Sequence, residues 1–415
     1  MQTTRLQLTE ISPYAAYLEG SSDSDTLIIA FSFRDTPPHS FSLVKTLAPY
    51  SASKLFLNCV HGTWYQEGIP PFGSTVEDTV RGLRNYAKDL GVSTVITMGT
   101  SMGGTAAIMY GLQIGARVLS FSPEVALRHA HSRSIEHLNN KPASQWDNLL
   151  PLMRSVDASR LEVICGDGDL VDLLQASLIR ETTHHVPRVM AGAAHGALQA
   201  IHKAGLVDDL LMRVLQNEPV SSLGGRLSPL PDLGVSGCLN HDAPSEADLL
   251  TAYYKLLHSF EAAPAVLFCQ AGRRLKRIDA DFAIRCLVVA VGLEPTKRDW
   301  IVDLTRLLRH QHRFRAALAI ASSAQRTSPG DVQLRFELAV SYACLNPRSA
   351  EALQLLSSIE DLDPLGTPDR IKGARTLLAL ERKDLARRWL ESVMSSDPNN
   401  SRAADLLATI QDRRG

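Results

Sequence analysis

A serine between two glycines is the first feature of this sequence that could do chemistry. The stretch GTSMG (99–103) follows a β-branched apolar run and precedes a helix-forming stretch. A serine hydroxyl becomes a good nucleophile when an imidazole takes its proton, and a carboxylate on the other ring nitrogen fixes the tautomer of that imidazole. Without these partners, the same five residues could form only a glycine-rich turn between a strand and a helix.

Candidate partners for Ser101 follow two later apolar runs of the chain. Asp167 and Asp169 lie directly after one run, and His195 lies in the loop GAAHG (192–196) after the next. If these runs are parallel strands, their carboxyl ends meet at one edge of a sheet, where loop side chains can converge. A nucleophile, a base and an acid could therefore meet there.

The elements that must position these residues alternate between strands and helices in the first half of the chain. Nearly continuous apolar runs are typical of strands covered on both faces, and strand–helix alternation indicates a mostly parallel sheet with flanking helices. The expected strands are 26–33, 54–60, 93–99, 117–122, 161–166 and 185–191, and the expected helices are 76–91, 105–116 and 197–217. His184 and His185 precede the last strand, so we expect them at the opposite edge of the sheet.

The context of Ser101 resembles the nucleophile elbow of the α/β-hydrolase family, where G-x-S-x-G joins a strand to a helix. The resemblance implies an acid and then a histidine after later strands, which His195 fits. The family's spacing after the acid strand selects Asp169, with Asp167 as the alternative. It also implies an oxyanion hole, with one donor at the backbone N–H of Met102.

The second oxyanion donor should come from the loop after the strand 26–33. We place it at Phe33, with Arg34 as the alternative. The sequence departs here from the family's common His-Gly pair, because it reads Phe-Ser-Phe-Arg. The loop 61–66, HGTWYQ, should reach the same edge, where its aromatic residues could contact a sugar or could pack locally. The stretch 124–156 is long enough for a small helical lid.

The second half of the chain carries a repeat of 34 or 35 residues. Prolines recur at 295, 329, 364 and 398, in steps of 34, 35 and 34, and an alanine precedes each by twelve residues: Ala283, Ala317, Ala352 and Ala386. Small residues at fixed positions let paired helices approach closely, and proline cannot continue the preceding helix. The period and spacing resemble the tetratricopeptide repeat, although the tryptophan and glycine of its first helix are missing. The resemblance implies a curved helical solenoid.

These patterns predict a two-domain protein. We expect an α/β-hydrolase-type sheet domain over 1–217, a linker rich in Gly, Pro and Ser over 218–246, and an all-α tetratricopeptide-like domain over 247–415.

Composition excludes several other classes of protein. The formal net charge of −1 gives no general attraction to nucleic acid, and no stretch is apolar and long enough to suggest a membrane span. The six scattered cysteines suggest buried free thiols rather than disulfides. With no signal-peptide pattern, the sequence predicts a cytoplasmic protein. We expect no cofactor and no metal.

The sequence therefore predicts a serine hydrolase that cleaves an ester through an acyl-enzyme on Ser101, with Asp169 and His195 completing the triad. The substrate would be a small-molecule or glycan ester, and the repeat domain would bind a protein partner or mediate self-association. Two alternatives stay open: acyl transfer to a glycan or other hydroxyl acceptor by the same residues, and a non-catalytic interaction protein.

Overall fold

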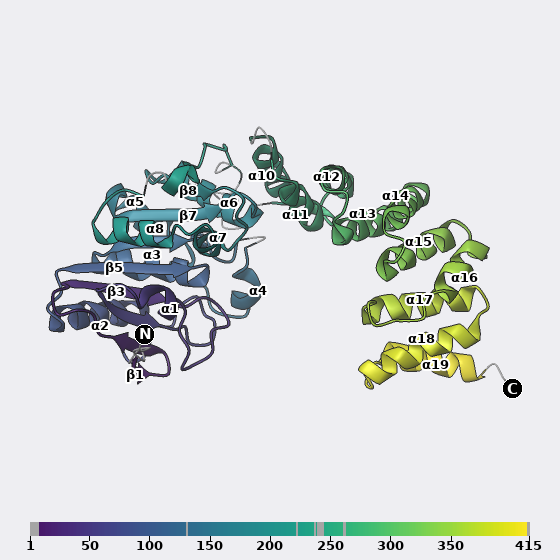
Figure 1. The fold of residues 1–415 in the computed structure, drawn as a ribbon, viewed down its shortest axis with the longest axis horizontal. Helices are drawn as coiled ribbons and strands as arrows, with labels where there is room; N and C mark the ends of the chain where they lie inside the picture. The colour runs from purple at the N-terminus through teal and green to yellow at the C-terminus, as the bar shows by residue number, and fades with distance from the viewer. Residues whose placement is uncertain are drawn as a thin grey trace. The chain divides into compact units, whose positions relative to one another are not determined.

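The chain divides into two compact units (Figure 1). A computed structural model describes residues 8–129, 132–220, 223–235, 238, 245–259 and 263–412. One unit spans Met1–Leu267 and the other Phe268–Gly415, and we call them the sheet unit and the repeat unit.

The sheet unit is built on one nine-stranded sheet with the strand order β1-β2-β4-β3-β5-β6-β7-β8-β9. Six adjacent strands run parallel to one another: β4, β3, β5, β6, β7 and β8. Strands β1, β2 and β9 pair with their neighbours in antiparallel fashion. The bounds are β1 Thr9–Ser12, β2 Ala15–Leu18, β3 Thr26–Phe31, β4 Ser53–Leu57, β5 Thr94–Thr100, β6 Arg117–Phe121, β7 Leu161–Gly166, β8 Arg188–Met190 and β9 Leu227–Pro229.

The expected α/β class and its six parallel strands are confirmed, since each expected apolar run contains one of β3 to β8 or overlaps most of it. The antiparallel strands β1, β2 and β9 were not expected. They are only three or four residues long, and they lie at the two ends of the strand order. The edge strands β1 and β9 are largely exposed and so carry little of the continuous apolar signal of buried strands. Strand β2 is mostly buried, but its four residues are too few to stand out as an apolar run.

Helices lie in the connections between the parallel strands, and two more follow β8. The connecting helices are α1 Val44–Leu47, α2 Val76–Asp89, α3 Met102–Ile114, α4 Ile135–Leu138, α5 Leu150–Arg154 and α6 Leu170–Thr182, and those after β8 are α7 Ala197–Lys203 and α8 Val207–Leu215. The single helix expected over 197–217 is two, because Gly205 adopts a left-handed φ of 70° between them. Helix α6 was not expected, although its residues from Leu170 to Ile179 are all buried.

Part of the stretch 218–246, expected to be a linker, is built into the sheet unit. Strand β9 pairs with β8, and Val220, Leu223 and Leu227 belong to a core cluster that includes side chains of β3, β5 and β6. These apolar residues are isolated among Gly and Pro residues, so the sequence pattern did not indicate that they are buried.

Helix α10 Glu246–Ser259 lies in the sheet unit, and α11 Ala265–Leu275 crosses the boundary between the units. In the repeat unit, the helices follow one another as antiparallel pairs (Figure 1). They are α12 Ala280–Leu293, α13 Arg298–His310, α14 Phe314–Thr327, α15 Val332–Leu345, α16 Ala350–Ser357, α17 Thr367–Ala379, α18 Lys383–Ser396 and α19 Ser401–Asp412. This all-helical architecture confirms the expected class.

The alanines and prolines that recur in the sequence occupy equivalent positions in successive helix pairs. Ala283, Ala317, Ala352 and Ala386 are all fully buried, one in each of α12, α14, α16 and α18. Each marked proline lies in the connection that follows one of these four helices. Trp389 fills the space that a missing side chain leaves at Gly373, where an added Cβ would lie 2.0 Å from the indole ring.

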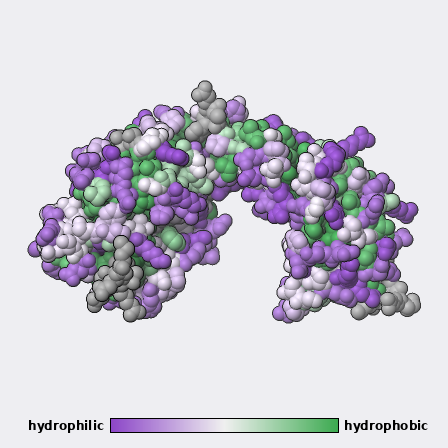
Figure 2. Space-filling view, viewed as in Figure 1, coloured by the Kyte–Doolittle hydropathy of each residue, from purple (hydrophilic) through white to green (hydrophobic). Residues whose placement is uncertain are grey.

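The described surface is mixed in polarity. Apolar residues stand between polar ones on the visible face of both units (Figure 2). Among the described residues, no helix combines the length and apolarity needed to cross a membrane. All six cysteines lie within the described ranges and are free thiols, five of them buried.

Candidate active site

Ser101 occupies a strained turn between β5 and α3. Its φ of 58° and ψ of −122° lie outside the regions that residues with a side chain usually adopt. A Cβ on Gly99 would lie 2.2 Å from the carbonyl oxygen of Gly103, and one on Gly103 would lie 2.3 Å from that of Phe31. The two glycines are therefore required for the close crossing of strand and helix. Strain of this kind collects at functional sites.

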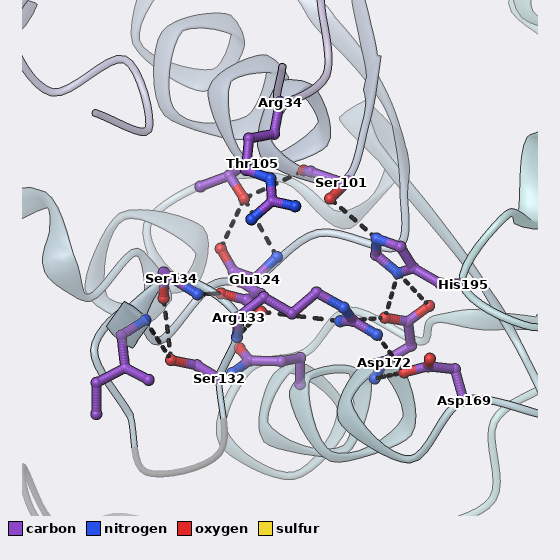
Figure 3. A network of polar contacts seen from close by, with 12 residues as sticks. Arg34, Ser101, Thr105, Glu124, Ser132, Arg133, Ser134, Asp169, Asp172 and His195 are labelled. Carbon is purple, nitrogen blue, oxygen red and sulfur yellow. Dashed lines mark hydrogen bonds and ion pairs between the residues drawn. The ribbon is translucent and has the colours of Figure 1, made fainter. Parts of the chain in front are cut away.

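His195 reaches Ser101 from the loop between β8 and α7 (Figure 3). Its Nε2 lies 2.9 Å from the Ser101 Oγ. The loop packs closely against the end of β7. The Gly168 amide donates to the Ala193 carbonyl at 2.8 Å, and a Cβ on Gly166 would lie 2.1 Å from the same carbonyl oxygen. The loop glycines of the acid segment thus position the histidine.

The carboxylate on the other side of His195 is Asp172, and not the expected Asp169. The Nδ1 of His195 lies 2.9 Å from Oδ1 and 3.1 Å from Oδ2 of Asp172. A carboxylate can only accept, so Nδ1 carries the proton and Nε2 is left to accept from the Ser101 hydroxyl. Ser101, His195 and Asp172 therefore have the connectivity of a nucleophile, a base and an orienting acid.

The two aspartates named from the sequence have other partners. Asp169 is the N-cap of α6 and accepts from the Asp172 amide at 3.0 Å, while Asp167 accepts from the Gly192 amide at 2.9 Å. Because α6 begins at Leu170, Asp172 lies in its first turn and points toward His195. The spacing Asp-x-x-Asp, a capping pattern at a helix start, is the signal that could have indicated this.

Arg133 joins the two acidic residues of α6 (Figure 3). Its guanidinium donates to Asp169 Oδ1 at 2.6 Å and to Asp172 Oδ1 at 3.0 Å. Burial and the nearby Asp169 raise the pKa of Asp172, although His195 and Arg133 oppose the shift. Burial also acts to raise the pKa of Asp169, but Arg133 outweighs it and the pKa is lowered. Arg133 had not been identified from the sequence.

The segment that carries Arg133 is connected to α3 through Glu124. The buried Glu124 side chain accepts from the backbone amides of Arg133 at 2.6 Å and Ser134 at 2.9 Å. The Thr105 hydroxyl of α3 donates to the Glu124 carbonyl at 2.9 Å. This segment contains the short helices α4 and α5, in the region expected to form a small lid.

The residues expected to form an oxyanion hole lie close to the elbow. Met102 is the first residue of α3, and the first amides of a helix have no partner within it. The loop after β3 is pressed against the elbow, since the Phe31 and Ser32 carbonyls are the nearest atoms to a Cβ built on Gly103. The Phe33 amide donates to the Ser42 Oγ at 3.4 Å, a long contact, whereas the Arg34 side chain pairs with Asp35 at 3.0 Å.

The remaining sequence candidates do not join the site. Trp64 and Tyr65 are buried, and the Tyr65 hydroxyl donates to the Ser32 carbonyl at 2.8 Å, so these aromatic rings pack locally. His184 and His185 contact the carbonyls of Val156 and Met153 at 2.6 and 2.8 Å, away from Ser101. Their position before β8 explains this placement.

Asp169, Asp172 and His195 also have the composition of a metal-binding group, because their ligand atoms lie within 4.8 Å of one another. The Arg133 guanidinium already supplies a cation to both carboxylates, and Nδ1 of His195 is committed to Asp172. The donor set therefore fits a proton-transfer site better than a metal site.

Comparison with known proteins finds matches among solved structures at low sequence identity. No family model matches the chain, and no curated protein matches it in sequence. Among solved structures, it is similar to the capsule O-acetyltransferase of Neisseria meningitidis serogroup A, at 16% identity and a TM-score of 0.38, over 50% of this chain and 94% of that one. It is also similar to YrrB, a tetratricopeptide-repeat protein with an unusual peptide-binding site, at 18% identity and a TM-score of 0.30, over 42% of this chain and 87% of that one. A third similar structure is a thermophilic tetratricopeptide-repeat protein of Thermus thermophilus, at 18% identity and a TM-score of 0.31, over 40% of this chain and 89% of that one.

Proposed function

We propose that this protein is a serine hydrolase that cleaves an ester through an acyl-enzyme on Ser101. The observation that carries the proposal is the continuous chain of hydrogen bonds from the Ser101 Oγ through His195 to the buried Asp172. Each residue follows a different strand of the sheet, and a structural turn at Ser101 would need neither of the other two.

The proposed reaction begins when the Ser101 Oγ attacks the ester carbonyl while Nε2 of His195 takes the hydroxyl proton. Asp172 stabilises the resulting imidazolium. The backbone N–H of Met102 and a second N–H from the loop at Phe33 donate hydrogen bonds to the oxyanion of the tetrahedral intermediate. Collapse of the intermediate expels the alcohol, which takes the proton from His195, and water then releases the acid by the same steps.

The experiment that tests this proposal is labelling by a fluorophosphonate, together with hydrolysis of short-chain aryl esters. Wild type should label at Ser101, as mass spectrometry would establish, and Ser101→Ala should lose labelling and at least about 10³-fold of the esterase activity. Ser122→Ala is the matched control, because Ser122 directly follows the neighbouring strand β6 and its buried Oγ makes no hydrogen bond among the described residues. A Ser101→Ala variant that still labels would overturn the proposal.

Analysis of the reaction products would identify the group that accepts the acyl chain from Ser101. Water gives free acid, whereas a hydroxyl acceptor such as a glycan gives a new ester. Product analysis with and without added glycan distinguishes the two.

We also propose that the repeat unit binds a protein partner or a second copy of the chain, because stacked helical pairs expose an extended surface. Sedimentation of the full chain over a range of concentrations tests self-association. The non-catalytic alternative requires that neither labelling nor turnover occurs.

A further inference from the structure

One arginine bridges both acidic side chains beside His195. The Arg133 Nη2 lies 2.6 Å from Asp169 Oδ1, and Nη1 lies 3.0 Å from Asp172 Oδ1. The Asp172 side chain is 1% exposed and that of Asp169 is 12% exposed. Two carboxylates this close and this buried repel each other unless a cation lies with them. Arg133 is that cation, and its planar fork matches a pair of carboxylate oxygens.

Arg133 is itself held in place by backbone contacts. Glu124 accepts from the amides of Arg133 and Ser134, and these two hydrogen bonds hold the backbone of the turn that carries the guanidinium. The Arg133 side chain is 25% exposed. The guanidinium therefore approaches the acids from a defined direction.

We propose that Arg133 is a positioning residue of the site: it holds Asp172 against His195 and cancels the charge of Asp169 there. This inference rests on the proposed function, because it concerns the same Ser101–His195–Asp172 triad. Arg133 acts through Asp172, and among the described residues it forms no hydrogen bond with Ser101 or His195.

Charged and titratable groups face this cluster from each neighbouring element. Arg133 and Glu124 come from the segment after β6, Asp169 and Asp172 from the start of α6, and His195 from the loop after β8. Cys165 in β7 is buried and interacts electrostatically with Asp167, Asp169 and Asp172. Among these groups Arg133 is the permanent cation, so its removal leaves His195 beside two unbalanced carboxylates.

The test is the pH dependence of kcat/KM for four proteins. In Arg133→Gln, the uncompensated carboxylates favour the imidazolium, which cannot accept the Ser101 proton. The acid limb of the kcat/KM profile, where activity rises with pH, should move to higher pH by roughly one unit. At a given pH on this limb, kcat/KM should be about tenfold lower. Asp169→Asn should move the limb to lower pH, and it keeps a residue that can cap α6. The double variant Arg133→Gln/Asp169→Asn removes one charge of each sign, so its limb should return close to that of wild type.

Two further variants separate positioning from general damage to the fold. Arg133→Lys keeps the charge but loses the fork, so the limb should stay near its wild-type position while kcat falls. Arg128→Gln is the matched control, because Arg128 lies on the same segment and pairs with Asp147 at 3.0 Å without contacting the triad. Its profile should match that of wild type.

The proposal is overturned if Arg133→Gln leaves the acid limb in place, if Arg128→Gln moves it equally, or if the double variant shows no recovery. Failure of the proposed function gives a different result, since wild type would then not label at Ser101. In that case, NMR titration of His195 in the same variants provides the readout. An unchanged midpoint in Arg133→Gln would overturn the positioning role.

Discussion

Both units of this molecule contain an arginine held between two acidic side chains, and they use the arrangement differently. In the sheet unit, Arg133 bridges Asp169 and Asp172. In the repeat unit, Arg306 of α13 lies 2.7 Å from both Glu337 of α15 and Asp369 of α17. The first cluster continues through a hydrogen bond to an imidazole and a strained serine, whereas the second joins three helices of the stack.

The comparison teaches that a buried ion pair is not by itself a sign of a functional site. Glu337 is 1% exposed and also pairs with Arg309, whose side chain is 4% exposed, yet the contacts of this network run from helix to helix. What distinguishes the cluster at Asp172 is its continuation through hydrogen bonds to the imidazole of His195 and the hydroxyl of Ser101.

The largest effect is expected from Asp172→Asn, because an amide at this position favours the wrong tautomer of His195. We expect kcat/KM for an aryl ester to fall about 10⁴-fold. Asp169→Asn is the matched change one helical turn away, and it should cost less than about tenfold at neutral pH. Equal losses in the two variants would remove the distinction between the acid and the capping residue.

In the repeat unit, Glu337→Gln should reduce stability and leave catalysis unchanged. The substitution leaves Arg309 buried without its counter-charge, which costs about 3–5 kcal/mol of unfolding free energy. Urea denaturation of the full chain followed by circular dichroism measures the loss, and Glu360→Gln at an exposed position is the control. A loss of esterase activity in the folded Glu337→Gln protein would show that the second cluster also serves the site.

Packing between the repeats can be tested without any change of charge. A Cβ at Gly373 would lie 2.0 Å from the Trp389 ring, so Gly373→Ala should destabilise the repeat unit by about 1–3 kcal/mol. At Gly330 an added Cβ meets nothing within 4 Å, and Gly330→Ala should change stability by less than about 0.5 kcal/mol. Similar denaturation midpoints for the two variants would contradict the close contact.

The smallest expected effect concerns the pH dependence of stability at Asp169. Its pKa is lowered in the folded state, because the attraction of Arg133 outweighs the effect of burial. The ionised form therefore stabilises the fold above the ordinary aspartate pKa, and this contribution is lost as pH falls through the lower folded value. Asp169→Asn should be less stable than wild type by about 1 kcal/mol at pH 6. The difference should shrink toward pH 3, and a constant difference would contradict the ion pair.

Much of the fold could be predicted from local patterns. The apolar runs of β3 to β8 are long enough to be read one by one, and the glycines around Ser101 indicate the crossing of strand and helix. The proline and alanine spacing indicated the register of the repeats, because each helix pair repeats the same local contacts. The short strands β1, β2 and β9 carry no such pattern. Strand β1 forms only a short hairpin with β2, and the pairing of β2 and β9 with the sheet depends on β4 and β8, which are distant in the chain.

The sequence by itself determined the elements of this protein and the residue types at the ends of its strands, because both follow from short-range periodicity and backbone sterics. Only the tertiary structure decided which acid meets His195. Asp167, Asp169 and Asp172 lie within six residues of one another, and the start of α6 directs each side chain to a different partner. The place of Arg133 was decided in the same way, because it lies 39 residues from Asp172 in the chain and reaches it only when the segment after β6 packs against α6.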